Sequence, residues 1–220
     1  MKILESAPHR YDIGIRLLTF GRLDKAYDRL VNHIERGQQV PDIGCGTGAL
    51  TLRAARRGAH VKGIDVNAQM LEIARQRANK AGLTESVDLV EMGVAELGSE
   101  EARHYDAVMS VLCLSELGEN ELTFTLKEVE RILHPGGLLL IADEVRPQGL
   151  FKRLIHLLIR APLSALVYAI TQATTHPVSD LPEKLKDAGL SIVSVRLNLL
   201  GSFGEFVCLP QKQKPADVSS

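Results

Sequence analysis

Hydrophobic and polar positions along this chain follow two different spacings. Five short apolar runs, each bounded by polar or glycine-containing segments, are typical of buried strands. The segments between most of them carry apolar residues three and four positions apart, as helices do. The strand-like runs are residues 40–43, 60–64, 87–92, 105–110 and 138–142, and the helix-like segments are 49–57, 67–80 and 119–133. This alternation predicts an α/β protein with a parallel sheet and helices on both faces.

The C-terminal part changes from this alternation to a hairpin pattern. A short helix is predicted over residues 180–188, and segments 191–199 and 203–209 alternate in polarity around Gly201. Two such segments joined by a glycine-containing turn predict an antiparallel pair of strands. The sheet should therefore contain seven strands, with one antiparallel strand at its C-terminal end.

Three further segments complete the predicted organisation. Residues 1–36 carry apolar positions at helical spacing and predict an N-terminal helical cap. Residues 147–177 are apolar with interspersed basic residues and predict a helical insertion, while residues 211–220 are polar and predict a disordered tail. A chain of 220 residues with 45% hydrophobic residues is sufficient for one well-buried domain, which we expect to span residues 1–210.

A glycine-rich turn after the first strand is the strongest functional signal. Gly44, Gly46 and Gly48 let the backbone turn sharply and approach a ligand closely, and the amides that open the next helix face that ligand. The spacing Gly44-x-Gly46-x-x-Ala49 also satisfies the dinucleotide fingerprint. Asp42 favours a different ligand, because a carboxylate repels a pyrophosphate but attracts the sulfonium and ammonium groups of S-adenosylmethionine (SAM).

A second acidic residue follows the second strand. Asp65 comes 17 residues after Gly48, close to the spacing of about 20 expected for a carboxylate that binds ribose hydroxyls. Both SAM and NAD contain that ribose, so Asp65 supports a nucleoside without choosing between them. Its alternative role is to cap the following helix. Val66 either packs on the purine or belongs to the core.

Composition and charge exclude several other classes. The formal net charge is −1 and the basic residues are scattered, so no footprint for nucleic acid is evident. Cysteines 45, 113 and 208 are odd in number and too far apart for a metal-ligand spacing, which favours a reducing cytoplasm and no metal site. The apolar stretch 154–170 is interrupted by His156, Arg160 and Pro162, which argues against a membrane-spanning helix. Peripheral contact of the protein with a membrane surface remains an alternative.

Four motifs in order resemble those of class I SAM-dependent methyltransferases, among them D-x-G-x-G-x-G at 42–48, Y-D-A-V at 105–108 and L-x-P-G-G at 133–137. The resemblance covers residues 38–209 and implies a Rossmann-like seven-stranded sheet of order 3-2-1-4-5-7-6. It implies that Asp42 and the glycine turn hold the methionine end, Asp65 the ribose, and residues 92–95 the adenine. The implied SAM contacts are Tyr11, Asp42, Gly44, Cys45, Gly46, Gly48, Asp65, Val66, Met70, Gly93, Val94, Ala95 and Ser110.

One position departs from the family pattern. Val94 stands where the family commonly has an aspartate that accepts a hydrogen bond from the adenine amine. A valine side chain cannot accept that bond. Either the Ala95 backbone holds the adenine edge alone, or Glu96 has taken over the role.

The sequence gives fewer signals for the residues that bind the methyl acceptor. Its candidate catalytic residues are Glu116, Glu144 and His176, with helix cap, solvated strand end and loop histidine as the respective alternatives. The sequence is similar to ubiquinone/menaquinone-biosynthesis methyltransferases, which implies a small apolar or cofactor-like acceptor. Segments 5–12, 114–117 and 175–177 also resemble methyltransferases associated with corrinoid proteins, which implies such a partner.

Two functions of other classes are alternatives to methyl transfer. A NAD-dependent oxidoreductase would need a Tyr-x-x-x-Lys or comparable set after the fourth strand, and the sequence has none there. A non-catalytic SAM-binding module remains an alternative function, because Val94 departs from the family pattern. A monomer and a homodimer are both compatible with the sequence.

Overall fold

The structure, a computed structural model, describes residues 22–147 and 177–211. Seven strands form one sheet in the order β3-β2-β1-β4-β5-β7-β6, which confirms the predicted topology. Only β7 runs antiparallel to its neighbours β5 and β6. The elements are α2 (Arg22–Val31), β1 (Gln39–Ile43), α3 (Ala49–Arg56), β2 (His60–Asp65), α4 (Ala68–Lys80), β3 (Val87–Glu91), η2 (Val94–Ser99), β4 (Tyr105–Val111), η3 (Leu114–Glu116), α5 (Glu119–Ile132), β5 (Leu133–Glu144), α7 (Leu181–Asp187), β6 (Leu190–Leu197) and β7 (Phe203–Pro210).

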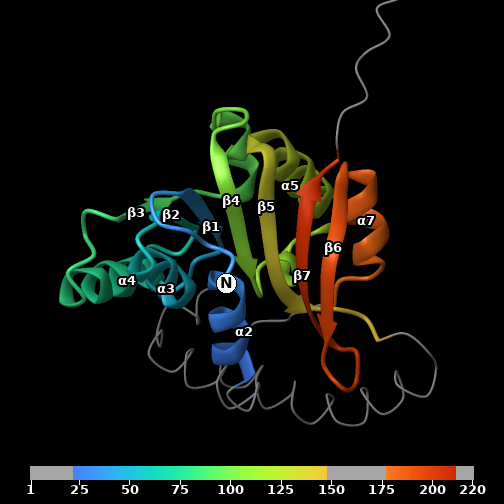
Figure 1. Ribbon diagram of the computed structural model, residues 1–220, viewed down its shortest axis with the longest axis horizontal. Helices are drawn as coiled ribbons and strands as arrows, with labels where there is room; N and C mark the ends of the chain where they lie inside the picture. The colour runs from blue at the N-terminus through green and yellow to red at the C-terminus, as the bar shows by residue number, and fades with distance from the viewer. Residues whose placement is uncertain (1–21, 148–176, 212–220) are drawn as a thin grey trace, which may run out of the picture.

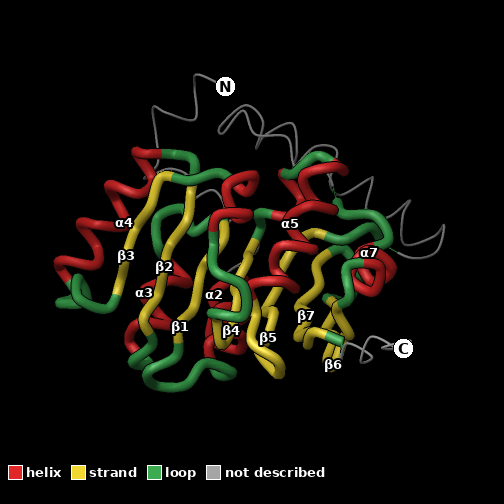
Figure 2. Tube along the Cα trace, turned by 90° about the horizontal axis from the view of Figure 1, so that it is seen from above, coloured by secondary structure: helices red, strands yellow, loops and turns green. Residues whose placement is uncertain are grey.

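Helices cover both faces of this sheet (Figures 1 and 2). The chain moves outward from β1 to β2 to β3 and then returns to β4, where the direction of the crossovers reverses. Because the crossovers are right-handed, the helices before the reversal lie on one face and those after it on the other. Helices α2 and α3 bury their apolar sides with Val40, Met109 and Leu140 in one core cluster. Helices α5 and α7 bury theirs with Ile43 and Ile141 in the other. Because strand residues alternate between faces, neighbours such as Leu140 and Ile141 belong to different cores.

The strand β5 is longer than its apolar run predicts. The sequence predicts a tight turn over residues 134–137 before the strand, whereas β5 begins at Leu133 and includes these residues. They form an irregular stretch in which the pairing with β4 jumps from Tyr105↔Leu133 to Ala107↔Leu138. Gly136 has φ +90°, and a Cβ on Gly137 would lie 3.0 Å from the Asp106 carbonyl oxygen. The two glycines therefore allow an extended segment to bulge past a neighbouring strand.

Pro41 lies inside the central strand β1, where a missing N–H should remove a ladder bond. The Gln39 N–H donates to the Asp106 carboxylate of β4 at 2.8 Å, so this edge of β1 faces β4. Successive N–H groups of a strand point to opposite sides, and the Pro41 nitrogen therefore faces β4 as well. The pairing of β1 with β4 begins only at Asp42↔Met109. Proline is tolerated because it stands just before that ladder starts.

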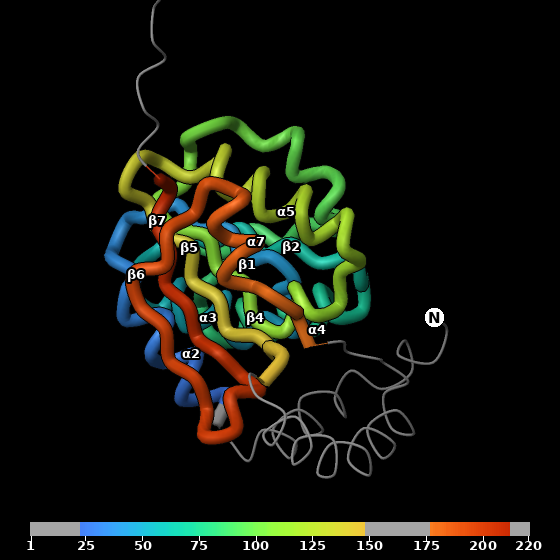
Figure 3. Tube along the Cα trace, turned by 90° about the vertical axis from the view of Figure 1, so that its right-hand side faces the viewer, coloured from blue at the N-terminus to red at the C-terminus, as the bar shows by residue number. Residues whose placement is uncertain are grey.

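The two ends of the described chain meet across the sheet. In α2, Arg29 forms two hydrogen bonds with Glu205 of β7, at 2.5 and 2.7 Å, although the residues are 176 positions apart. Part of the predicted cap 1–36 is thus a helix of the main core. Strands β3 and β6 form the two edges of the sheet. Strand β6 is seen in Figure 3, and all of its residues after Leu190 are exposed.

Several predictions fall outside the described residues. They concern residues 1–21, most of the 147–177 insertion and most of the 211–220 tail, so these assignments stay predictions, as does the single domain over 1–210. Among the described residues, no helix has the length and apolar composition needed to cross a bilayer.

Candidate functional site

The candidate site lies where the sheet order reverses. Strands β1 and β4 are neighbours, and the chain continues outward from β1 through β2 on one side and from β4 through β5 on the other. Ligands of open α/β sheets bind beyond the carboxyl ends of strands at such a point. The glycine turn follows β1 and residues 112–116 follow β4, while Asp65 and Glu144 are the last residues of β2 and β5.

The glycine turn needs its glycines for two separate reasons. Gly44, Gly46 and Gly48 have φ values of +72°, +52° and +78°, a region that residues with a side chain rarely adopt. A Cβ on Gly44 would also lie 2.6 Å from both Cβ and Sγ of Cys113, whereas one on Gly46 would meet no atom within 4 Å. The turn is therefore packed against the segment after β4 at Gly44 and is open at Gly46.

Asp42 lies beneath this turn and is almost inaccessible, with 2% of its surface exposed. Its Oδ2 accepts a hydrogen bond of 2.6 Å from the hydroxyl of Thr51 in α3. Burial raises the pKa of Asp42 to about 7, an effect that the bond from Thr51 opposes. Asp42 therefore anchors the helix that follows the turn, and it can act on a ligand through its charge more than through direct contact.

Asp65 ties the end of β2 to the glycine turn. One carboxylate oxygen accepts the Gly46 N–H and the other accepts the Asn67 N–H, both at 2.8 Å. Burial raises the pKa of Asp65, and these backbone donors oppose the rise. Its alternative role as a helix cap is wrong, because the cap of α4 is Asn67, whose side chain accepts from the Gln69 and Met70 N–H groups.

The predicted adenine side carries an exposed apolar residue. Val66 is 71% exposed, so it is not part of the core. A Cβ built on Gly93 would lie 3.6 Å from a Val66 methyl group, which puts the two residues side by side. Ala95 is exposed, and the carboxylate of Glu96 accepts the Gly93 N–H at 3.0 Å. Val94 is half-buried and packs against the core on the α5 face.

Three predicted cofactor contacts have buried side chains. Cys45, Met70 and Ser110 are 7%, 5% and 1% exposed. The Ser110 hydroxyl donates to the Ile43 carbonyl oxygen at 3.3 Å, and burial strongly raises the pKa of the Cys45 thiol. These residues line the interior behind the turn, so their side chains support the site more than they present groups to a ligand.

The acceptor side gathers carboxyl groups. Burial raises the pKa of Glu116 to about 7, and the negative charges of Asp143, Asp65 and Glu144 add to the rise. Glu116 is nevertheless an exposed residue by surface area, so water screens part of that repulsion. Glu144 is half-buried. The structure thus brings Glu116 and Glu144 together, whereas the predicted residues Tyr11 and His176 lie outside the described residues.

Sequence reasoning missed the supporting partners of this site. Thr51 and Asn67 are absent from the predicted site residues although each bonds a site segment. Asp143 was expected with Glu144 on the acceptor side, but its bond to the segment after β4 was not. Thr51 and Asn67 look like ordinary helix residues in the sequence. Asp143 was visible as the first polar residue after the buried run of β5, but its partners lie 28 and 29 positions away.

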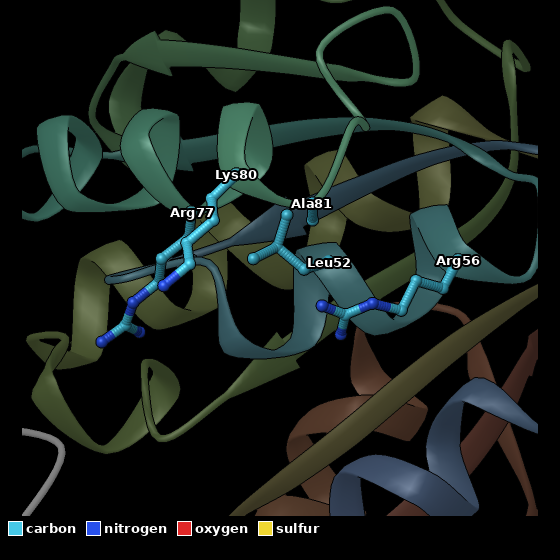
Figure 4. A pocket seen from close by; sticks show the side chains of 5 residues that line it. All are labelled: Leu52, Arg56, Arg77, Lys80 and Ala81. Atoms are coloured by element: carbon cyan, nitrogen blue, oxygen red, sulfur yellow. The ribbon is translucent and has the colours of Figure 1, made fainter.

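A basic recess of about 360 Å³ lies between α3 and α4, and it is lined by Leu52, Arg56, Arg77, Lys80 and Ala81 (Figure 4). Arg77 donates to the hydroxyl and the carbonyl oxygen of Thr47 at 2.7 and 3.2 Å. Since Thr47 lies within the glycine turn, Arg77 braces that turn from α4. The basic residues at the ends of both helices also complement the helix dipoles.

Comparison with known proteins agrees with this architecture. Residues 40–137 match the family described as "Methyltransferase domain". The chain is 30% identical over 139 residues to the demethylmenaquinone methyltransferase of Tropheryma whipplei, covering 63% of this chain and 55% of that protein. It is 29% identical over 116 residues to the tuberculostearic acid methyltransferase of Mycobacterium tuberculosis, covering 53% of this chain and 26% of that protein. The chain thus spans little more than half of the first relative's length.

Solved structures share the fold. The putative methyltransferase in complex with the Haloferax volcanii Trm112 activator superposes with a TM-score of 0.72 at 19% identity, covering 96% of this chain and 99% of that one. A SAM-dependent methyltransferase from Aquifex aeolicus superposes with a TM-score of 0.61 at 19% identity, covering 85% and 88%.

Proposed function

We propose that this chain, a class I SAM-dependent methyltransferase by family and fold, transfers the methyl group of SAM to a small apolar acceptor, of which an isoprenoid quinol is the best-supported candidate. One observation carries the choice of cofactor. The carboxyl groups of Asp42, Asp65, Glu116 and Asp143 gather around one glycine turn, and burial raises the pKa of each of them.

Such a group of carboxyls suits a cation and disfavours an anion. Negative charges held close together repel one another, and a positive ligand relieves that repulsion. When bound, SAM supplies an activated methyl group on a positively charged sulfur. A pyrophosphate at the same turn would add negative charge, so a dinucleotide fits this site poorly. The acidic site also favours SAM over its neutral product, S-adenosylhomocysteine.

The site residues take the following roles in this proposal. Asp65 binds the ribose hydroxyls, and Val66 packs on the purine beside Gly93, since its exposed apolar side chain has room for a flat ring. Adenine recognition rests on the Ala95 backbone, because Glu96 already accepts the Gly93 N–H. The glycine turn contacts the methionine end through its backbone.

Glu116 is the proposed general base. An aromatic acceptor gives up a proton when its ring carbon bonds to the methyl group, and a base near that carbon accelerates the transfer. A carboxyl group whose pKa is raised to about 7 is suited to accept and return a proton near neutral pH. Glu144 lies close enough for its charge to act on Glu116 and would orient the acceptor's hydroxyl groups.

The acceptor class rests on the relatives. One relative is named for demethylmenaquinone and another for tuberculostearic acid, and both compounds are lipophilic. A corrinoid-protein partner stays a prediction from segments 5–12, 114–117 and 175–177. Of these, segment 5–12 and residues 175–176 lie outside the described residues. A non-catalytic SAM-binding module is the alternative outcome of the test below.

The test has two stages. Calorimetry with SAM, S-adenosylhomocysteine and NAD should give binding of the first two only, and binding of NAD alone would refute the proposal. Methyl transfer from radiolabelled SAM is then measured to a short-chain demethylmenaquinol, with Glu116→Gln as the catalytic variant and Lys127→Ala, an exposed residue of α5, as the matched control. SAM binding without transfer to quinols or corrinoid-linked acceptors would favour the binding module.

A further inference from the structure

The segment after β4 is held in an unusual conformation. Leu112 has φ +56°, a left-handed backbone conformation that is disfavoured for a residue with a branched side chain. Its N–H donates to the Ala142 carbonyl oxygen of β5 at 3.0 Å. The segment then turns into η3, which carries Glu116. Residues in such strained conformations persist only where their surroundings over-determine them.

Asp143 is the group that fixes this segment. Its side chain is fully buried at the end of β5. One carboxylate oxygen accepts the N–H groups of Leu114 and Ser115 at 2.8 and 3.3 Å, and the other accepts the Glu144 N–H at 2.7 Å. A buried carboxylate is costly unless it is paired, so three backbone donors compensate for its desolvation.

The same segment is packed against the cofactor turn on its other side. Cys113 is so close to Gly44 that a Cβ on the glycine would lie 2.6 Å from both Cβ and Sγ of the cysteine. Asp143, residues 112–116 and the glycine turn therefore form one contiguous unit. A shift of the segment would move Glu116, which stands at its end, relative to the turn.

We propose that Asp143 is a positioning residue for methyl transfer: its carboxylate holds residues 112–116 against the glycine turn and so fixes Glu116 relative to the cofactor. The inference deepens the proposed function and rests on it for the role of Glu116. The holding of the segment itself can be tested without any acceptor. Asp143 would not contact the acceptor, because its side chain is buried.

The experiment compares Asp143→Asn with a matched control. An asparagine keeps the shape of the side chain but replaces one acceptor oxygen with an NH₂ donor, so it cannot bond all three N–H groups. The control is Asp106→Asn, because Asp106 also bonds a backbone N–H, that of Gln39, but at the opposite end of the sheet. Both variants are produced as the full chain and checked by circular dichroism.

Hydrogen exchange gives the first readout. In Asp143→Asn the amides of Leu114 and Ser115 should exchange about 10- to 100-fold faster than in the wild type, the range expected for losing a buried bond to a charged acceptor. In the Asp106→Asn control they should exchange at the wild-type rate. Unchanged exchange at these two amides in Asp143→Asn would overturn the proposal, whatever the activity.

Enzyme kinetics gives the second readout. A selective loss of acceptor turnover would not be expected if the role of Asp143 were merely structural. The dissociation constant of SAM should stay within about threefold of the wild-type value, while kcat/KM for short-chain demethylmenaquinol should fall at least tenfold. Equal losses in SAM affinity and acceptor turnover would overturn the positioning role. If the wild type binds SAM but methylates no quinol, the proposed acceptor fails while the exchange result still decides the role of Asp143.

A second variant covers a failure of Asp143→Asn to fold. Asp143→Glu keeps the charge but adds one methylene, which should displace the segment and weaken its bonds to the Leu114 and Ser115 N–H groups. Faster exchange at Leu114 and Ser115 with unchanged SAM affinity would support the proposal. Wild-type exchange together with wild-type kcat/KM in Asp143→Glu would overturn it.

Discussion

Replacing Gly44 with alanine should destabilise the protein much more than the same replacement at Gly46. Both glycines have positive φ, +72° and +52°, so both alanines suffer the left-handed backbone penalty. Only Gly44 is also packed closely, with Cβ and Sγ of Cys113 at 2.6 Å from the position that a new Cβ would take. The pair therefore separates a conformational cost from a packing cost.

The expected magnitudes follow from these two terms. The left-handed conformation costs a residue with a side chain about 1–2 kcal/mol, and this applies to both variants. Forcing an extra carbon into a packed interior adds about 1–3 kcal/mol, and this applies to Gly44→Ala alone. Cys113 cannot relieve the contact by changing rotamer, because its Cβ is attached directly to the backbone. Gly44→Ala should lose about 2–5 kcal/mol in total.

Urea unfolding without SAM measures the difference. The chain has no tryptophan, so the transition is followed by far-ultraviolet circular dichroism. The double variant Gly44→Ala/Cys113→Gly removes the atoms that clash and should recover about 1–3 kcal/mol in a double-mutant cycle. If Gly44→Ala and Gly46→Ala are destabilised equally to within about 0.5 kcal/mol, or if the cycle gives no coupling, the packing argument is wrong.

Three further predictions are tested by unfolding or by calorimetry. Burial raises the pKa of Asp42 from 3.8 to about 7 in the folded protein, so the folded state holds this proton more tightly and the free energy of unfolding should fall as pH rises from 4 to 7. Asp42→Asn should flatten that slope, and an unchanged slope would contradict the assignment. Asp65→Ala should weaken SAM binding by about 1–3 kcal/mol in calorimetry, and unchanged affinity would show that Asp65 only braces the turn. Arg29→Met removes both bonds to Glu205 and should lower the free energy of unfolding, measured in urea, by about 1 kcal/mol. The loss should be smaller in high salt, because Arg29 is partly exposed and salt screens its charge. A loss that salt does not change would argue against the ion pair.

The fold was predictable because its signals are local. Each buried strand is a short apolar run, and each helix carries a stripe at its own spacing, so the type and order of the elements follow from neighbouring residues. The predicted order 3-2-1-4-5-7-6 rests on the family resemblance, and the structure has that order. The error at the start of β5 also has a local cause, since Pro135, Gly136 and Gly137 are turn residues in isolation.

The candidate site was predictable only in part. Glycines and acidic residues after strands can be recognised in the sequence because strand ends meet at one edge of a parallel sheet. What each carboxylate bonds to was not predictable. Asp65 was expected to be a ribose ligand or a helix cap. Its ribose role stays a prediction, its bond to Gly46 of the glycine turn was not expected, and Asn67 caps the helix.

The sequence by itself determined the class of element at each position, the glycine turn and the acidic residues around it, since these depend on backbone freedom and local polarity. Only the tertiary structure decided the contacts between distant segments. Arg29 meets Glu205 across 176 positions, and Asp143 meets the Leu114 amide across 29. Such pairs form because the sheet aligns segments that have no local relation. The strained segment 112–116 and its partner Asp143 therefore become visible only once β4 and β5 lie side by side.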